Sequence, residues 1–236
     1  MISVIMPTLW RGEHYKKMLP IFNDHPLIGE IIIIDNDPSN TDRSIFELIK
    51  VRHYAQIENI YVNPAWNLGV QLSECDQICL YSDDVLFDPK CIEEVAKVCT
   101  PRGGIAGFAI ETISESHDVP NHLAPWEQLR VTPTPSMHYR FGICMFMHRE
   151  SYMHIPDQLK IYYGDTYLFD QNVINGRSNF RIEGCPVITK MRTSSKSREF
   201  TEITVKDAEE YAKLSPTEGM ILDFAQQLAK EYEEKK

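Results

Sequence analysis

The chain has 236 residues, a formal net charge of −10 and a hydrophobic content of 43%. The apolar share allows a sizeable core, and the acidic balance argues against indiscriminate binding to nucleic acid or anionic membranes. No apolar run approaches the roughly 20 residues that span a bilayer, and the N-terminal apolar run lacks the basic lead of a signal peptide. The six cysteines form no CxxC pair, so we expect reduced core thiols in a cytoplasmic protein.

The first hundred residues alternate between strand and helix patterns. Four consecutive isoleucines at positions 31–34 suit a strand that is covered on both faces, which is typical of a parallel sheet. The alternation predicts an α/β fold with right-handed crossovers. The expected strands are 2–6, 30–35, 60–62 and 78–81, and the expected helices are 13–23, 43–50, 65–74 and 89–99.

The second half is less regular. Residues 111–137 are rich in Pro, His and Thr and predict loops around a short helix near Trp126. We find no internal repeat and no low-complexity linker, so one domain with a C-terminal helical appendage is expected. The expected strands are 103–110, 141–148 and one or two within 181–191, and the expected helices begin near Arg149 and at 164, 206 and 217.

Two adjacent carboxylates, Asp83 and Asp84, follow the strand that ends at Tyr81. Two neighbouring negative charges are unfavourable unless a cation offsets them. A divalent metal with oxygen ligands or a nearby Lys or Arg would do so. Ligands bind at the carboxyl ends of strands in open α/β sheets, so this stretch is our first candidate site. The alternative is an Asp-rich turn that caps the next helix.

Several motifs in the first half resemble those of the family-two glycosyltransferases, which have the GT-A fold. The opening Val4–Thr8 looks like the family's first strand and donor loop, and Ile34–Asp42 resembles its "VDDGSTD" turn. Tyr81–Val85 is similar to the DxD-type motif, with Ser82 at the first acidic position, and Asn67-Leu-Gly69 matches a common "N-x-G".

Two further motifs extend the resemblance to about residues 2–192. Phe141–Arg149 looks like the acceptor-side strand, and Tyr163–Phe169 resembles the "G-[ED]-D" region that supplies the catalytic base. The resemblance implies a Rossmann-like, mostly parallel sheet flanked by helices. It also implies a GT-A domain over 1–200, with a nucleotide-sugar half at 1–100, an acceptor and catalytic half at 101–200, and C-terminal helices at 201–236.

The resemblance also implies roles for individual residues. Asp84 would hold a divalent metal, Mn²⁺ or Mg²⁺, and Asp83 would hold the ribose hydroxyls or a water near the metal. Asp165 would act as the general base of an inverting transfer. Asn36 replaces the acid that reads uracil in the family. An amide can still pair with uracil, so a UDP-sugar is favoured while the nucleotide stays open. The other implied donor-binding residues are Pro7, Thr8, Asp35 and Asn67.

After the last core strand the family often has a metal-binding His, where this chain has Lys190. A protonated ammonium cannot ligate a metal, but it can lie beside a diphosphate. We therefore expect Lys190 or Arg192 to share in stabilising the leaving group. The metal would then bind weakly without donor, because phosphate and water would supply most of its ligands. The alternative is that Lys190 is a solvated lysine at the strand end.

Two other function classes remain open. A nucleotidyltransferase would need a Gly-rich, basic phosphate loop, and Pro7–Gly12 offers one Gly and one Arg. A non-catalytic nucleotide- or sugar-binding module would keep the fold without turnover. The acceptor is unknown. The basic stretch 190–198 is compatible with a phosphate-bearing acceptor, including a modified nucleic acid, as well as with a carbohydrate. The histidines match no common zinc spacing.

Overall fold

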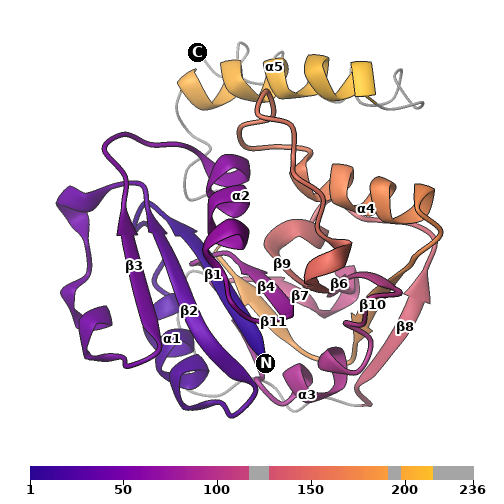
Figure 1. Ribbon diagram of the computed structural model, residues 1–236, viewed down its shortest axis with the longest axis horizontal. Coiled ribbons are helices and arrows are strands. Elements are labelled where there is room, and N and C mark those ends of the chain that lie inside the picture. The colour runs from indigo at the N-terminus through magenta and orange to yellow at the C-terminus, as the bar shows by residue number, and fades with distance from the viewer. Residues whose placement is uncertain (117–127, 191–197, 215–236) are drawn as a thin grey trace.

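The computed structural model describes residues 1–116, 128–190 and 198–214. Its central sheet has eight strands in the order β3-β2-β1-β4-β9-β6-β10-β8 (Figure 1). These are β1 (Ile2–Thr8), β2 (Ile28–Asp35), β3 (Val51–Ala55), β4 (Gln77–Tyr81), β6 (Gly103–Phe108), β8 (Arg130–Thr134), β9 (Cys144–His148) and β10 (Ser178–Glu183). Strands β1 to β4 are parallel to one another, whereas β9 and β8 run antiparallel to their neighbours.

Both faces of this sheet are covered. Successive side chains of a strand point to opposite faces, so Ile31 and Ile33 of β2 share one core with helices α1 (Tyr15–Asp24) and α3 (Cys91–Ala96). Ile32 and Ile34 of β2 share the other core with helices α2 (Val62–Leu72) and α4 (Gly164–Ile174). All four isoleucines are fully buried. The predicted mostly parallel α/β sheet, flanked by helices, is confirmed.

A smaller three-stranded sheet consists of β5 (Val85–Phe87), β11 (Val187–Thr189) and β7 (Ile113–Glu115). Strand β11 lies antiparallel to β5, with Thr189 opposite Val85. This pairing brings the chain at residue 190 beside Asp84, although the two residues are far apart in sequence.

The expected strand at 60–62 is wrong. The third parallel strand is β3, and Val62 is already the first residue of α2. Two β-branched residues around Tyr61 suggested a strand, but Pro64 lies in the first turn of a helix, where a missing N–H costs nothing. The expected helix at 43–50 is also wrong, because only short 3₁₀ turns form there, at 38–40 and 43–47.

The middle of the chain also differs from expectation. Strands β7 and β8 lie in the stretch predicted as loops, and only a 3₁₀ turn at 149–151 follows β9. Each of these strands is short and gains its hydrogen bonds from distant partners, so no local pattern marks it. The helices predicted near Trp126 and at 217–232 lie outside the described residues.

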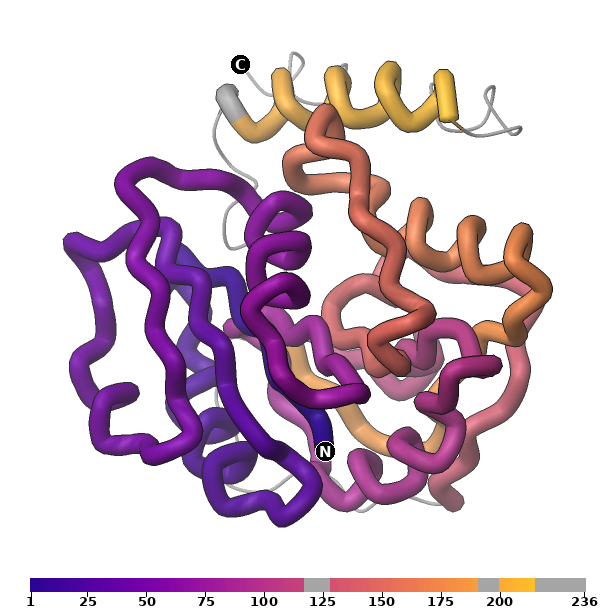
Figure 2. Tube along the Cα trace, in the orientation of Figure 1, coloured from indigo at the N-terminus to yellow at the C-terminus, as the bar shows by residue number. Residues whose placement is uncertain are grey.

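Helix α5 (Arg198–Leu214) crosses the end of the molecule opposite the N-terminus (Figure 2). It begins well before the expected position 206, so the division predicted after residue 200 falls inside it. The carboxylate of Asp207 accepts hydrogen bonds from the backbone N–H groups of Lys160, Ile161 and Tyr162, at 2.9, 2.7 and 2.8 Å. The ring of Tyr211 stacks on Tyr163 with centroids 5.2 Å apart. These contacts fix α5 against the loop before α4.

None of the helices in the described part of the chain combines the length and apolar character that a bilayer crossing requires.

Arg149 ties β9 to the end of α2. Its guanidinium donates to the backbone oxygens of Val70, Ser73 and Cys75, at distances from 2.5 to 3.3 Å. Val70 lies in the last turn of α2, and Ser73 and Cys75 follow it, so this side chain holds the segment that leaves the helix. Arg149 therefore has a structural role in the strand that resembles the acceptor-side motif.

We predict that Arg149→Ala lowers the free energy of unfolding by about 2–4 kcal/mol, because it leaves these carbonyls without their charged donor. Urea denaturation followed by circular dichroism measures the change. Arg102→Ala removes the same side chain from an exposed position and should change stability by less than about 0.5 kcal/mol. Equal effects of the two variants would contradict this role for Arg149.

Candidate active site

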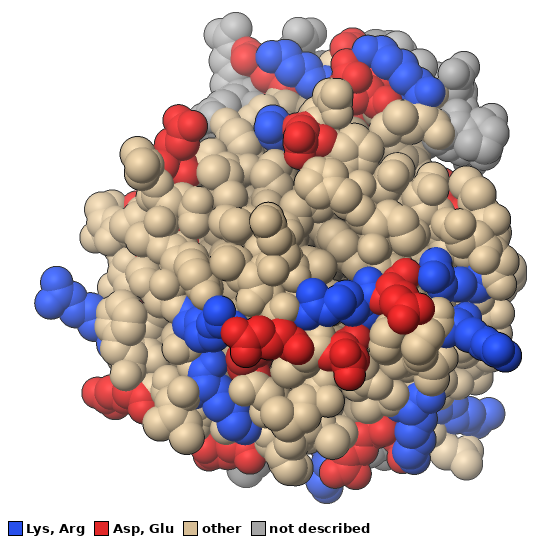
Figure 3. All heavy atoms as spheres, in the orientation of Figure 1, with Lys and Arg blue, Asp and Glu red and all other residues tan. Residues whose placement is uncertain are grey.

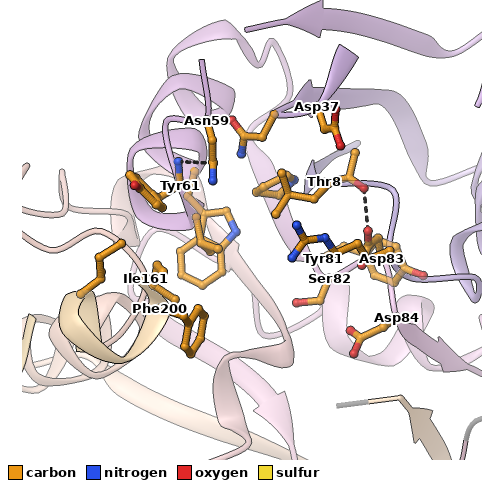
Figure 4. Close-up of a pocket in the computed structure, with 17 residues that line it drawn as sticks. Thr8, Asp37, Asn59, Tyr61, Tyr81, Ser82, Asp83, Asp84, Ile161 and Phe200 are labelled. Carbon is orange, nitrogen blue, oxygen red and sulfur yellow. Dashed lines mark hydrogen bonds between the residues drawn. The ribbon is translucent and has the colours of Figure 1, made fainter. Parts of the chain in front are cut away.

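A pocket of about 410 Å³ opens at the carboxyl ends of β1, β2 and β4, the edge at which α/β sheets bind ligands. Figure 4 shows Ser82, Asp83 and Asp84 on one side of it and Ile161 and Phe200 on the other. The pocket therefore has a carboxylate-rich side and an apolar side. The predicted site residues that line it are Pro7, Thr8, Asn36, Asp83 and Asp84.

Asp83 is held by the loop that follows β1. Its Oδ2 accepts from Thr8 Oγ1 at 2.6 Å, and the backbone N–H of Gly12 also donates to its carboxylate. A Cβ on Gly12 would lie 2.5 Å from Asp83 Oδ1, so only glycine allows this approach. Burial raises the pKa of Asp83 to about 6, with a further contribution from Asp84, although the bond from Thr8 opposes the rise.

Asp84 is 8% exposed, and its Oδ2 accepts from Thr189 Oγ1 at 3.2 Å. Its backbone oxygen contacts Nδ1 of the buried His14 at 2.5 Å. A carbonyl can only accept, so this nitrogen carries the hydrogen. No motif marked His14 in the sequence, because its contact joins residues 70 positions apart.

The structure places Lys190 directly beside Asp84. The backbone N–H of Lys190 donates to the backbone oxygen of Asp84 at 3.2 Å. Its ammonium lies 3.9 Å from the carboxylate of Glu13, and its side chain does not line the pocket among the described residues. Arg192 lies outside the described residues.

The oxygen donors of Ser82, Asp83 and Asp84 suit a hard divalent cation such as Mg²⁺ or Mn²⁺. Within the described residues, no group of three or more His, Cys, Asp or Glu side chains forms a complete metal site. A cation bound at Asp84 would therefore need further ligands from a phosphate-bearing ligand and from water. The donor set fits a metal that binds together with such a ligand.

Asp35 does not line the pocket. It is fully buried, and its carboxylate accepts from Trp10 Nε1 at 2.7 Å, from Thr41 Oγ1 at 2.5 Å and from His53 Nε2 at 2.8 Å. These bonds tie the end of β2 to the loops on either side. The structure thus gives Asp35 a part in shaping the pocket through the loop that carries Trp10.

Asn36 does line the pocket. Its Oδ1 accepts from the backbone N–H of Ile60 at 3.1 Å, which fixes the orientation of the amide. Within the described residues the amide nitrogen donates no hydrogen bond, so an N–H donor is available at this edge of the pocket. The neighbouring Asp37 also lines the pocket, and its carboxylate accepts from Ser39 and Asn40.

Asn67 lies away from the pocket. Its amide bonds both the N–H and the C=O of Ile155, at 3.0 and 2.8 Å, and it accepts from Tyr152 at 2.6 Å. These bonds join α2 to the segment that leads to α4. In this chain the "N-x-G" motif therefore packs two elements together.

Asp165 lies in the first turn of α4, and the described residues lining the pocket do not include it. Its carboxylate packs on Gly142, where a Cβ would lie 2.4 Å from its Oδ2. The next residue, Ile143, accepts a hydrogen bond from the N–H of Ser82 at 3.1 Å. Asp165 is thus linked to the Asp83 turn through two contacts, its own with Gly142 and that of Ile143 with Ser82. Burial raises its pKa, although hydrogen bonds from Thr166 and Gly142 oppose the rise.

Sequence reasoning missed the residues on the apolar side of the pocket. Phe200 and Ile203 come from α5, Trp66 comes from α2, and Ile161 comes from the loop that Asp207 fixes. These residues belong to separate elements, and each one alone looks like an ordinary core position. The available signal was Asp207, a carboxylate on the buried face of an amphipathic helix, because a buried carboxylate needs hydrogen-bond donors from a neighbouring segment.

Comparisons with known proteins identify a family and similar solved structures. The family model described as "Glycosyl transferase family 2" matches residues 3–155. S. aureus TarS 1-349 in complex with UDP-GlcNAc aligns with a TM-score of 0.60 and 12% identity, over 98% of this chain and 71% of that chain. The mannosyltransferase PcManGT from Pyrobaculum calidifontis, in complex with GDP-Man and Mn²⁺, aligns with a TM-score of 0.61 and 15% identity, over 98% and 68%. No curated protein matches the sequence.

Proposed function

The chain belongs to glycosyl transferase family 2 and has the GT-A fold, and from this membership we propose that it moves a sugar from a nucleotide diphosphate sugar to an acceptor hydroxyl. The observation that carries the proposal is the pair Asp83 and Asp84, which lines a pocket at the carboxyl end of β4. The complexes of TarS with UDP-GlcNAc and of PcManGT with GDP-Man support this class of donor.

We propose that the nucleotide lies against the ends of β1 and β2, near Thr8 and Asn36. The amide N–H of Asn36 can donate to a carbonyl oxygen of the base, and the second lone pair of its Oδ1 can still accept. Uracil offers both kinds of group, so a UDP-sugar is the favoured donor.

A divalent metal, Mn²⁺ or Mg²⁺, would neutralise charge that develops on the departing diphosphate. Asp84 is the residue proposed to hold it, and the Mn²⁺ in the PcManGT complex supports a metal of this kind. Asp83, whose pKa burial raises to about 6, places a second carboxyl group beside that site. The metal would bind weakly without donor, because the described residues offer few of its ligands.

Asp165 is the proposed general base. A buried carboxylate with a raised pKa is better matched to proton abstraction near neutral pH than an exposed one. Attack by the activated hydroxyl on the face opposite the leaving group would invert the configuration at the anomeric carbon. The contact of Asp165 with Gly142, next to the residue that bonds Ser82, supports its placement near the donor.

The acceptor is proposed only as a hydroxyl-bearing molecule, either a carbohydrate or a phosphate-bearing compound such as a modified nucleic acid. On the face drawn in Figure 3, basic and acidic side chains are interspersed, so this face supports no broad affinity for phosphate polymers. We also propose a cytoplasmic location, since all six cysteines are free and five are buried.

Donor hydrolysis tests the proposed function, because many transferases slowly hydrolyse their donor. The purified protein is incubated with Mn²⁺ and with UDP-, GDP- and CDP-sugars, and free nucleotide is measured. We expect release of one nucleotide above the others. Binding of a nucleotide sugar without any release or transfer would instead indicate a non-catalytic binding module.

We predict that Asp84→Ala lowers donor turnover by about 100-fold or more, because the leaving group loses its metal. Steady-state kinetics at saturating Mn²⁺ measures the effect, and circular dichroism checks the fold. Asp88→Ala, a few residues further along outside the pocket, is the matched control and should retain activity. Near-normal turnover by folded Asp84→Ala protein would refute the metal-binding role.

For Asp165→Asn we predict a fall in kcat of about 100-fold or more, with donor affinity by calorimetry almost unchanged. The base acts as a carboxylate, so activity is lost as pH falls through its pKa. Burial raises that pKa, so the acidic limb of the wild-type kcat profile should lie above the ordinary Asp range near 4. Asp170→Asn, on the same helix, should keep the wild-type kcat and the wild-type position of the acidic limb. Loss of donor affinity would assign Asp165 to the donor site instead.

Lys190→Ala tests whether the ammonium of Lys190 helps to stabilise the diphosphate. We expect about a three- to tenfold loss of turnover at saturating Mn²⁺, together with weaker donor binding, because one positive charge near the phosphates is removed. Paired titrations of wild type and variant with donor measure both quantities. Full affinity and turnover in the variant would show that Lys190 is a solvated lysine at the strand end.

A further inference from the structure

The charges around the pocket are unbalanced. Asp37, Asp83 and Asp84 line it, and among the described residues Arg11 is the only Lys or Arg that does so. A nucleotide diphosphate would add more negative charge to these carboxylates. Anions bind such a site only when cations offset this repulsion. A divalent metal at Asp84 offsets part of it, and Arg11 is the cation that the protein itself places in the lining.

The loop between β1 and α1 fixes the position of Arg11. The preceding residue, Trp10, has a φ of 58°, a left-handed conformation that costs energy for an aromatic residue. Three hydrogen bonds hold this loop: Trp10 N–H to Thr8 Oγ1 at 2.7 Å, Trp10 Nε1 to Asp35 at 2.7 Å, and Gly12 N–H to Asp83. Local strain that tertiary contacts maintain is characteristic of functional sites.

The guanidinium of Arg11 is available for a ligand. The side chain is exposed, and within the described residues it donates no hydrogen bond and forms no ion pair. Arg11 lines the pocket together with Asp37 and Asp83, and it also borders a neighbouring hollow that Asp37 lines, so its guanidinium lies on the carboxylate side. A structural arginine of this chain, Arg149, has its donors occupied by backbone carbonyls.

We propose that Arg11 binds the diphosphate of the donor and stabilises it as the leaving group, an inference that rests on the proposed function. In the transfer, the bond from the anomeric carbon to the phosphate oxygen breaks, and its electron pair leaves with the diphosphate. The acceptor oxygen forms the new bond to that carbon, and its proton passes to Asp165. The planar guanidinium can donate two parallel hydrogen bonds to phosphate oxygens, which an ammonium cannot match.

The test compares a nucleoside diphosphate with its nucleoside. Calorimetry first identifies which of UDP, GDP and CDP the wild type binds in Mn²⁺, and that diphosphate and its nucleoside are then titrated into Arg11→Ala and Arg11→Lys. We expect Arg11→Ala to weaken diphosphate binding by about tenfold or more and to change nucleoside binding by less than twofold. Arg11→Lys should recover only part of the lost diphosphate affinity. The kcat for transfer should fall more in Arg11→Ala than in Arg11→Lys.

The matched control is Lys16→Ala, which removes one positive charge from a neighbouring hollow that Arg11 also borders. It should change diphosphate binding by less than twofold. An equal loss for diphosphate and nucleoside in Arg11→Ala, or no loss for either, would overturn the inference and leave the proposed function standing. A wild type that binds none of the diphosphates would refute the proposed function itself.

Discussion

The site depends on holding two adjacent carboxylates, Asp83 and Asp84, in a largely buried turn. Removal of a carboxylate from water disfavours its charged form, and this cost explains the raised pKa of Asp83. The chain offsets it with donors from distant elements: Thr8 and Gly12 from the loop after β1, and Thr189 from β11. The small sheet that carries β11 is therefore part of the site's support.

Backbone strain occurs at three aromatic residues of the described chain. In the described part of the chain, the non-glycine residues with positive φ are Trp10, Tyr61 and Tyr163. Trp10 precedes Arg11, Tyr61 lines the pocket, and Tyr163 lies two positions before Asp165. An aromatic residue adopts this conformation only where its surroundings enforce it. Two of the three strained residues therefore adjoin proposed site residues, Arg11 and Asp165, and the third lines the pocket.

The pocket is completed by a region beyond the family match, which ends at residue 155. Helix α5 supplies Phe200 and Ile203, and Asp207 fixes the loop that supplies Ile161. A carboxylate that accepts three backbone N–H bonds is a strong, directional anchor. The apolar side of the pocket therefore combines the C-terminal part of the chain with Trp66 of α2, whereas the carboxylate side lies within the matched residues.

The sequence by itself determined the α/β class, the buried strands of the parallel half and the Asp83-Asp84 turn, because periodicity and short motifs are local. Only the tertiary structure decided that Asp35 and Asn67 bond residues of other segments, that α5 closes the pocket, and that Arg11 lines it. Strand β3 was missed for the same reason: it is a half-exposed edge strand, recognisable by its pairing with β2. Contacts between residues tens of positions apart leave no signal in any short stretch of sequence.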